Sequence, residues 1–190
     1  MTLIEQLNAA GFPVRNVSDL YTQKHDYRSA VPLLVAALHE VQNNEVLEEI
    51  VRALSVKWAK PFAAKPLVEL FGCTSDDREL GLRWVVGSAL AVVADASVFD
   101  ELVRLVRHRG YGRSREMLPL ALAGMKSAKA DQILITLLDD EDLKGHAMMA
   151  INKRGVMIDR ASLEKVLEDP RAWVRKEARK ARVVGRAGEN

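Results

Sequence analysis

Few side chains in this 190-residue sequence have the types and spacing that catalysis or metal binding requires. None of its histidines, His25, His39, His108 and His146, is followed one helical turn later by a second histidine or a carboxylate. A transition-metal site on a helix needs at least two such ligands on one face. Cys73 is the only cysteine, which excludes an internal disulfide and a thiolate-rich zinc site. The sequence therefore predicts no catalytic residues, no metal centre and no cofactor.

Basic side chains form two runs that could bind phosphate groups. The first is the arginine-rich stretch 104–115, and the second, 171–186, contains seven basic residues and one acidic residue in a chain whose net charge is +2. A nucleic-acid track is uniformly positive, but acidic turns at 76–77 and 139–142 are predicted to flank the first run, which we therefore interpret as structural ion pairs. The second run has two interpretations, a polar cap at the end of the array or a binding surface. The candidate contacts of such a surface are Lys176, Arg179 and Lys180.

Three apolar side chains are candidate contacts for a protein partner. Trp84 and Trp173 occupy matching places beside a Leu-Arg and a Val-Arg pair, and tryptophan is enriched at the hot spots of interfaces. Met149 belongs to a Met-Met pair next to His146, and methionine adapts its shape to varied surroundings. Packing in the core is the alternative interpretation of all three.

The elements that hold these residues are predicted to be helices. The chain is 48% hydrophobic but only 5% aromatic, and Ala, Leu, Val and Arg recur throughout, which favours helices over strands. No segment stays apolar and uncharged long enough to cross a bilayer, and the first residues lack the pattern of a signal peptide. We therefore expect an all-α, cytoplasmic protein without a membrane partner.

A spaced pattern recurs five times along the chain. It consists of an apolar or small residue, another four positions later and an alanine three further on, which places all three on one helix face. The alanines are separated by 36, 32, 29 and 31 positions, the length of two short helices with their turns. We expect each of these alanines to pack against a neighbouring helix: Ala53, Ala89, Ala121, Ala150 and Ala181.

Other amphipathic stretches lie between these helices and supply the first helix of each pair. Two of them are predicted to begin near Pro32 and Pro66, because proline lacks a backbone N–H and this lack costs least in the first turn of a helix. Pro119 falls inside a predicted second helix and is expected to kink it. Thr2 and Ser18 are predicted to cap two short helices ahead of the array. The chain thus divides into an N-terminal helical cap 1–27, a repeat array 28–184 and a frayed tail 185–190.

The last unit carries the clearest resemblance to a known family. From Asp169 to Ala178 it reads DPRAWVRKEA, and this order of a turn aspartate, Val-Arg and alanine resembles the HEAT-like repeats of the armadillo-type superhelices, including those of phycobilin lyases. The resemblance implies a right-handed α-solenoid of about five antiparallel helix pairs over roughly residues 28–183. It also implies a structural ladder between adjacent repeats, from basic Arg83, Arg115, Lys144 and Arg175 to the turn aspartates Asp77, Asp139 and Asp169.

This resemblance is specific for a fold and says little about an activity. Without catalytic groups, we expect a non-enzymatic binding module or scaffold whose second helices line a concave surface that holds a protein or peptide. The alternative is a nucleic-acid-binding protein, similar to the HEAT-like alkylpurine DNA glycosylases, that uses the basic C-terminal helix with Trp173 stacked on a base. A catalytic carboxylate of that family cannot be placed here. A small-molecule partner, such as the tetrapyrrole of phycobilin lyases, is not expected.

Overall fold

The computed structural model describes residues 1–23, 26–75, 78 and 80–184, so that His25 and the predicted tail 185–190 lie outside the description. Helices supply nearly all of the regular structure, which confirms the predicted all-α class. Two short helices, α1 (Leu3–Ala9) and α2 (Asp19–Thr22), come first. Ten more follow as five consecutive pairs: α3 (Val31–Glu40) with α4 (Asn44–Leu54), α5 (Lys60–Cys73) with α6 (Leu82–Val93), α7 (Phe99–Arg107) with α8 (Leu118–Ala123), α9 (Ala128–Thr136) with α10 (Lys144–Arg154), and α11 (Arg160–Leu167) with α12 (Ala172–Ala178).

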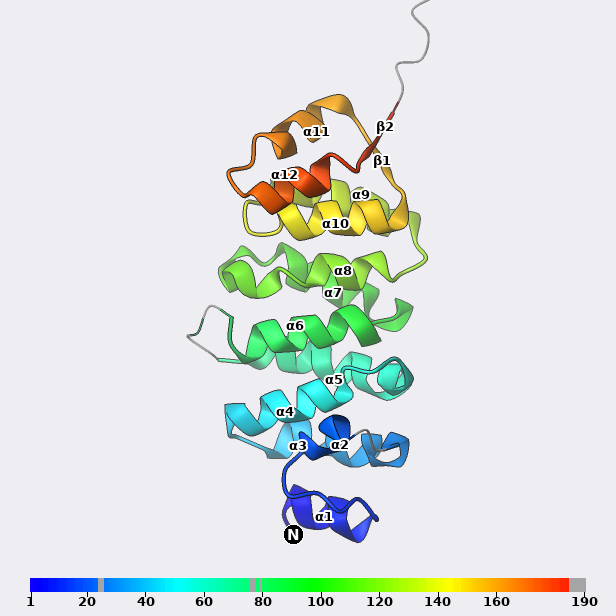
Figure 1. The fold of residues 1–190 in the computed structure, drawn as a ribbon, viewed down its shortest axis with the longest axis vertical. Helices are drawn as coiled ribbons and strands as arrows, with labels where there is room; N and C mark the ends of the chain where they lie inside the picture. The colour runs from blue at the N-terminus through cyan, green and yellow to red at the C-terminus, as the bar shows by residue number, and fades with distance from the viewer. Residues whose placement is uncertain (24–25, 76–77, 79, 185–190) are drawn as a thin grey trace, which may run out of the picture.

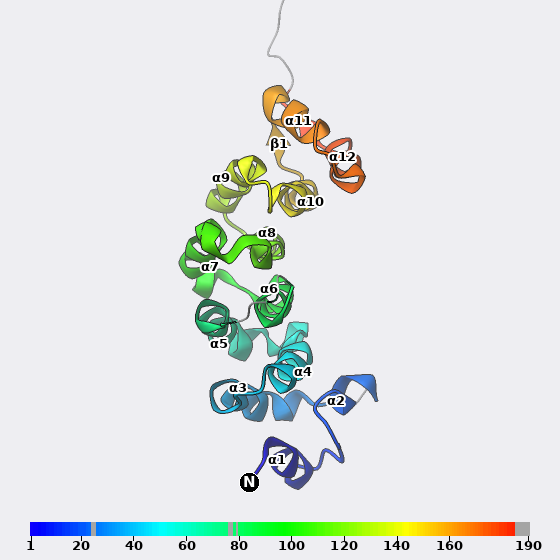
Figure 2. The same cartoon turned by 90° about the vertical axis from the view of Figure 1, so that its left-hand side faces the viewer.

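The five pairs are stacked along the long axis of the molecule, with their helices in two rows (Figures 1 and 2). The second helices α4, α6, α8, α10 and α12 form one row, in which each packs against the next. The first helices α3, α5, α7 and α9 form the other. The turns inside the pairs lie along one long edge, the turn edge, and the links between pairs lie along the opposite one, the connecting edge (Figure 1). The two ends of every second helix therefore lie at different edges.

Side-chain and backbone caps fix several helix boundaries. Thr2 forms a reciprocal capping box with Glu5 at the start of α1, as predicted. Asn43 accepts two backbone N–H groups from the first turn of α4, at 2.8 and 3.1 Å. Gly155 ends α10 with a φ of 68°, a left-handed conformation that favours glycine. These caps bind backbone groups that a helix end leaves unpaired.

One hydrophobic core runs through all layers, from Leu7 to Ala178. Small side chains in this core let neighbouring helices approach closely. The prediction for the fifth recurring alanine holds only in part: Ala181 is half-buried and packs against the core, but it lies outside any helix, because α12 already ends at Ala178 and the chain continues into a short strand. The other four are buried as predicted: Ala53, Ala89, Ala121 and Ala150.

Two prolines and one serine differ from their predicted roles. Pro61, not Pro66, lies in the first turn of α5, and Pro66 lies inside this helix. Pro119 lies in the first turn of α8, where its missing N–H has no intrahelical acceptor to lose. The second helix therefore starts at this proline instead of being kinked by it. The Ser18 hydroxyl donates to Asn16 Oδ1 at 2.6 Å and caps no N–H of α2.

Short 3₁₀ segments and one strand pair complete the connections. Strands β1 (Met157–Ile158) and β2 (Arg182–Val183) pair in parallel, with Met157 opposite Arg182. This pairing ties the chain after α12 to the link that follows α10. No helix among the residues described combines the length and the apolar composition needed to span a bilayer. The 3₁₀ segments are η1 (Arg28–Ala30), η2 (Lys57–Ala59), η3 (Ala96–Val98), η4 (Arg109–Arg115) and η5 (Leu137–Asp139).

Candidate functional site

Apolar side chains are exposed along the row of second helices. Within the described ranges, four of the large hydrophobic residues that face solvent lie on second helices, and the first helices contribute one, Phe62 of α5. Single exposed apolar residues are ordinary, but here they recur at several levels of one row. We call this set the apolar row: Val46 of α4, Val92 of α6, Met149 of α10 and Trp173 of α12.

Trp173 has the largest of these side chains, and its neighbours hold it in place. Its six-membered ring lies over Gly145 in the first turn of α10, where a β-carbon would come within 3.0 Å of three ring carbons. The His146 ring packs edge-on against it with 5.3 Å between centroids, and the Arg171 guanidinium lies 5.8 Å from its centroid. Trp173 is nevertheless 41% exposed. It therefore offers a pre-positioned aromatic surface.

The charges beside Trp173 are neutralised. Arg171 donates two hydrogen bonds to the Asp169 carboxylate, at 2.9 Å each, and this guanidinium lowers the pKa of Asp169 to about 2. The same contact raises the pKa of Arg171. Burial lowers the pKa of His146, although the Glu116 carboxylate opposes the shift. At neutral pH the indole therefore lies beside an uncharged imidazole and a compensated ion pair.

Trp84 occupies the corresponding place in α6 but is less accessible. It is half-buried and packs against the core. Its indole N–H is buried and has no hydrogen-bond partner in the part of the chain that the structure describes. Of the three apolar residues predicted to contact a partner, Met149 and Trp173 thus lie at the surface, whereas Trp84 mainly packs inside.

Two of the four basic residues in the predicted ladder reach carboxylates of the next layer. Arg115, only 1% exposed, lies 3.0 Å from Asp140 and 3.3 Å from Asp142. Lys144 lies 3.7 Å from Asp169. Both contacts join one helix pair to the turn of the following pair.

Asp139, in contrast, does not face Arg115 as the ladder requires. It is exposed and contacts Lys165 of α11 at 3.0 Å. The turn after η5 directs the next side chain, Asp140, inward to the arginine, because Asp140 rather than Asp139 is buried there. The predicted pairing is therefore displaced by one residue.

The remaining two basic residues of the ladder bind backbone carbonyls. Arg83 donates to two carbonyls at the end of α5, and Arg175 donates to two carbonyls in the turn before α12, at 2.7 Å each. Both occupy acceptors that a helix end or turn leaves open. Asp77, the third predicted aspartate of the ladder, lies outside the described residues.

The predicted basic contacts of the last helix are exposed. Lys180 pairs with Glu177 at 2.5 Å, whereas the described residues offer neither Lys176 nor Arg179 an oppositely charged group within 4.0 Å. Arg179 and Lys180 lie about 10 Å along the helix from Trp173, at 1.5 Å per residue. The aromatic candidate therefore lies near the turn edge and these cations lie near the connecting edge (Figure 1).

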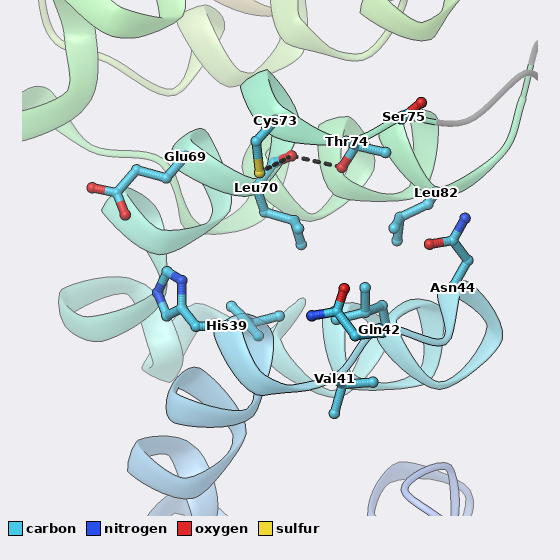
Figure 3. A pocket seen from close by; sticks show the side chains of 12 residues that line it. His39, Val41, Gln42, Asn44, Glu69, Leu70, Cys73, Thr74, Ser75 and Leu82 are labelled. Atoms are coloured by element: carbon cyan, nitrogen blue, oxygen red, sulfur yellow. Dashed lines mark hydrogen bonds between the residues drawn. The ribbon is translucent and has the colours of Figure 1, made fainter.

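A cleft of about 690 Å³ opens between the first two helix pairs on the turn edge. His39 of α3 and Glu69 and Cys73 of α5 line it, together with leucines and side-chain amides (Figure 3). The Cys73 thiol donates to the Leu70 carbonyl at 3.6 Å. No three His, Cys, Asp or Glu side chains in the described ranges are arranged to hold a metal. The sequence did not bring His39, Glu69 and Cys73 together because they lie on different helices.

Gly145 is the residue of this site that the sequence analysis missed. A glycine inside a helix costs about 1 kcal/mol relative to alanine. A glycine in a predicted helix was therefore the one sign in the sequence that this position cannot hold a side chain. Its reason, the ring of Trp173 from the next layer, becomes visible only in three dimensions.

Comparisons of this chain with protein-family models, with curated proteins and with solved structures each find no match.

Proposed function

We propose that the five helix pairs form a right-handed α-solenoid of HEAT-like repeats that acts as a non-enzymatic binding module. Support comes from the stacked pairs (Figure 2), from the buried alanines that recur in successive second helices, and from the DPRAWVRKEA motif of the last unit. In such arrays each unit buries its apolar face only against its neighbours. The outer side of one helix row is then free for a partner.

The partner that we propose is a protein segment that lies along the apolar row. The observation that carries this proposal is the presence of Val46, Val92, Met149 and Trp173 on the second helices, with Trp173 already fixed over Gly145. Helix layers are about 10 Å apart, and an extended chain advances about 3.3 Å per residue. A matching peptide therefore has apolar side chains about three positions apart for adjacent layers and about six apart across α8, which contributes no member of the row.

Nucleic-acid binding by the C-terminal helix with Trp173 stacked on a base has less support. The indole already packs against Gly145 and His146. The basic side chains Arg179 and Lys180 lie near the other end of α12, and Lys180 is paired. A nucleotide cannot stack on this indole and contact these two cations without spanning the length of the helix.

Selection from a random peptide library on the full chain tests the proposed function. The double variant Met149→Ser/Trp173→Ser removes two members of the apolar row. Its matched control is Phe62→Ser, which removes the exposed apolar side chain of a first helix. We expect selected peptides with apolar residues about three or six positions apart, bound at least tenfold more weakly by the double variant and equally by the control.

Two results would overturn this proposal. One is a library that yields no peptide bound by the wild-type chain. The other is a set of peptides whose affinity falls no further in the double variant than in Phe62→Ser. Circular dichroism of each variant shows whether it has kept the helical fold.

A further inference from the structure

The connecting edge of the last two layers carries a dense group of basic side chains. Segments 124–131, 152–160 and 176–184 together contain nine basic and three acidic residues, a charge of +6 in a chain whose net charge is +2. The remainder of the chain is therefore net negative, at −4. We call five exposed members of this group the basic edge: Lys126, Lys129, Lys153, Arg179 and Arg182.

Partly buried polar contacts bring these three segments together. Arg154, at the end of α10, pairs with Asp131 of α9 and donates to the carbonyls of Met125 and Ser127. The loop that carries Lys126 is thereby held beside the end of α10. The structure thus builds this part of the edge on a fixed loop.

The end of α12 and strand β2 are attached to the same place. Asn152 of α10 donates to the backbone carbonyl of Glu177 in α12 at 2.9 Å. The Arg182 guanidinium crosses the end of α10, with Nη1 only 3.4 Å from where a β-carbon on Gly155 would lie. The three segments therefore lie next to one another at the connecting edge of the last two layers (right-hand side of Figure 1).

The carboxylates within the three segments already have partners, and one exposed carboxylate outside them, Asp100 of α7, lines the same cleft as Lys126 and Lys129. Asp131 is paired with Arg154, and Glu177 with Lys180. Asp159 accepts from the backbone N–H and the hydroxyl of Ser162, at 2.8 and 2.7 Å. In the described ranges, no oppositely charged group lies within 4.0 Å of any of the five cations of the basic edge. Their positive charges are thus free to meet an external anion.

Helix stability does not explain all of these positions. Cations near a helix C-terminus complement the helix dipole, which accounts for Lys153 and Arg179. Lys129, however, lies in the first turn of α9, where a positive charge is unfavourable by about 0.3–1 kcal/mol. Lys126 lies in a loop and contributes to no helix. The helix dipole therefore does not account for these two lysines.

We propose that the basic edge binds the phosphate backbone of nucleic acid without reading its sequence. Its cations belong to two adjacent layers, about 10 Å apart. The three segments contain no aromatic side chain that could stack on a base. Contacts to the phosphate backbone, which carry no sequence information, are therefore expected. The peptide surface proposed above consists of other residues, the apolar row of the second helices, so this inference does not depend on it.

Titration of the full chain with a fluorescein-labelled mixed-sequence DNA strand, between about 50 and 200 mM salt, tests the inference. The variant Lys153→Gln/Arg179→Gln/Arg182→Gln removes three charges from the basic edge. The matched control Arg104→Gln/Arg107→Gln/Arg109→Gln removes three exposed charges from the turn edge. We expect the first variant to bind at least tenfold more weakly, with a salt slope lower by about 2, because each phosphate contact in a single strand contributes about 0.7.

The control variant is expected to retain affinity within about threefold, because the acidic turn 139–142 lies beside its arginines. Absence of DNA binding at about 50 mM salt overturns the inference. An equal loss in both variants also overturns it, because the effect would then reflect net charge alone. Equal or tighter binding to vesicles rich in phosphatidylserine, or to poly-glutamate, identifies a membrane or an acidic protein as the partner and likewise overturns it.

Discussion

The indole of Trp173 covers Gly145 of the neighbouring layer so closely that no side chain fits between them. This contact joins the first turn of α12 to the first turn of α10. It also fixes the direction of the one tryptophan that is both exposed and placed on the row of second helices. One glycine thus couples the packing between two layers to the shape of the candidate binding surface.

The first prediction concerns this contact. Gly145→Ala forces Trp173 out of its position, because a β-carbon would overlap three carbons of its ring. We expect a net loss of about 1–3 kcal/mol in unfolding free energy, the range for overpacking. The 19F resonance of 5-fluorotryptophan at position 173 should also shift. Gly72→Ala is the control, because a β-carbon there makes only ordinary contact with Leu105. A normal Trp173 resonance in Gly145→Ala would contradict the contact.

A second prediction concerns the buried arginine of the turn edge. Arg115→Met leaves the Asp140 carboxylate, whose side chain is 11% exposed, without its buried partner. We expect a loss of about 3–5 kcal/mol in unfolding free energy, as for other broken buried pairs. Arg104→Met breaks the exposed contact with Glu101 and should cost less than about 1 kcal/mol. Equal losses of unfolding free energy for the two variants in denaturant titrations would show that the Arg115–Asp140 pair does not stabilise the contact between these layers.

A third prediction is an acid-dependent loss of stability through Asp169. Its hydrogen bonds from Arg171 lower its pKa from 3.8 to about 2, so the folded chain favours the carboxylate. The resulting stabilisation is complete above pH 3.8 and is lost as the pH falls through about 2. It amounts to about 2 kcal/mol. Asp169→Asn should therefore flatten the dependence of unfolding free energy on pH in this window. The control Asp26→Asn, which removes one member of an exposed ion pair, should keep the pH dependence of the wild type. If Asp169→Asn also keeps it, Asp169 is not the source of the acid-dependent loss of stability.

A fourth prediction tests the recurring alanines. Ala150→Leu adds three carbons to a fully buried site in α10 and should lower the unfolding free energy by about 1–3 kcal/mol. Ala181→Leu changes a half-buried residue beyond the end of α12 and should stay within about 0.5 kcal/mol of the wild type. Thermal and denaturant unfolding measure both. If Ala150→Leu is as stable as Ala181→Leu, close approach of the second helices does not require alanine.

The sequence was informative where a feature repeats and uninformative where contacts cross layers. Periodicity identified the helical class and four of the five buried alanines, because these follow from one helix face. It was right only in part at Ala181, which packs against the core from the segment between α12 and β2. The family resemblance implied Asp139, the first of four consecutive carboxylates, as a ladder residue. The path of the turn places Asp140 and Asp142 beside Arg115 instead. The contact of Trp173 with Gly145 had no local signature beyond an unfavourable glycine.

The most direct measurement of the central claim is site-specific photocrosslinking to a peptide selected on the wild-type chain. A photoreactive benzoylphenylalanine is placed at Met149 on the second-helix row, or at the exposed Gln132 of the first helix α9 in the same pair. The account predicts that the peptide crosslinks from position 149 and not from position 132. Crosslinking from position 132 alone, or equally from both, would contradict a partner that lies along the second helices.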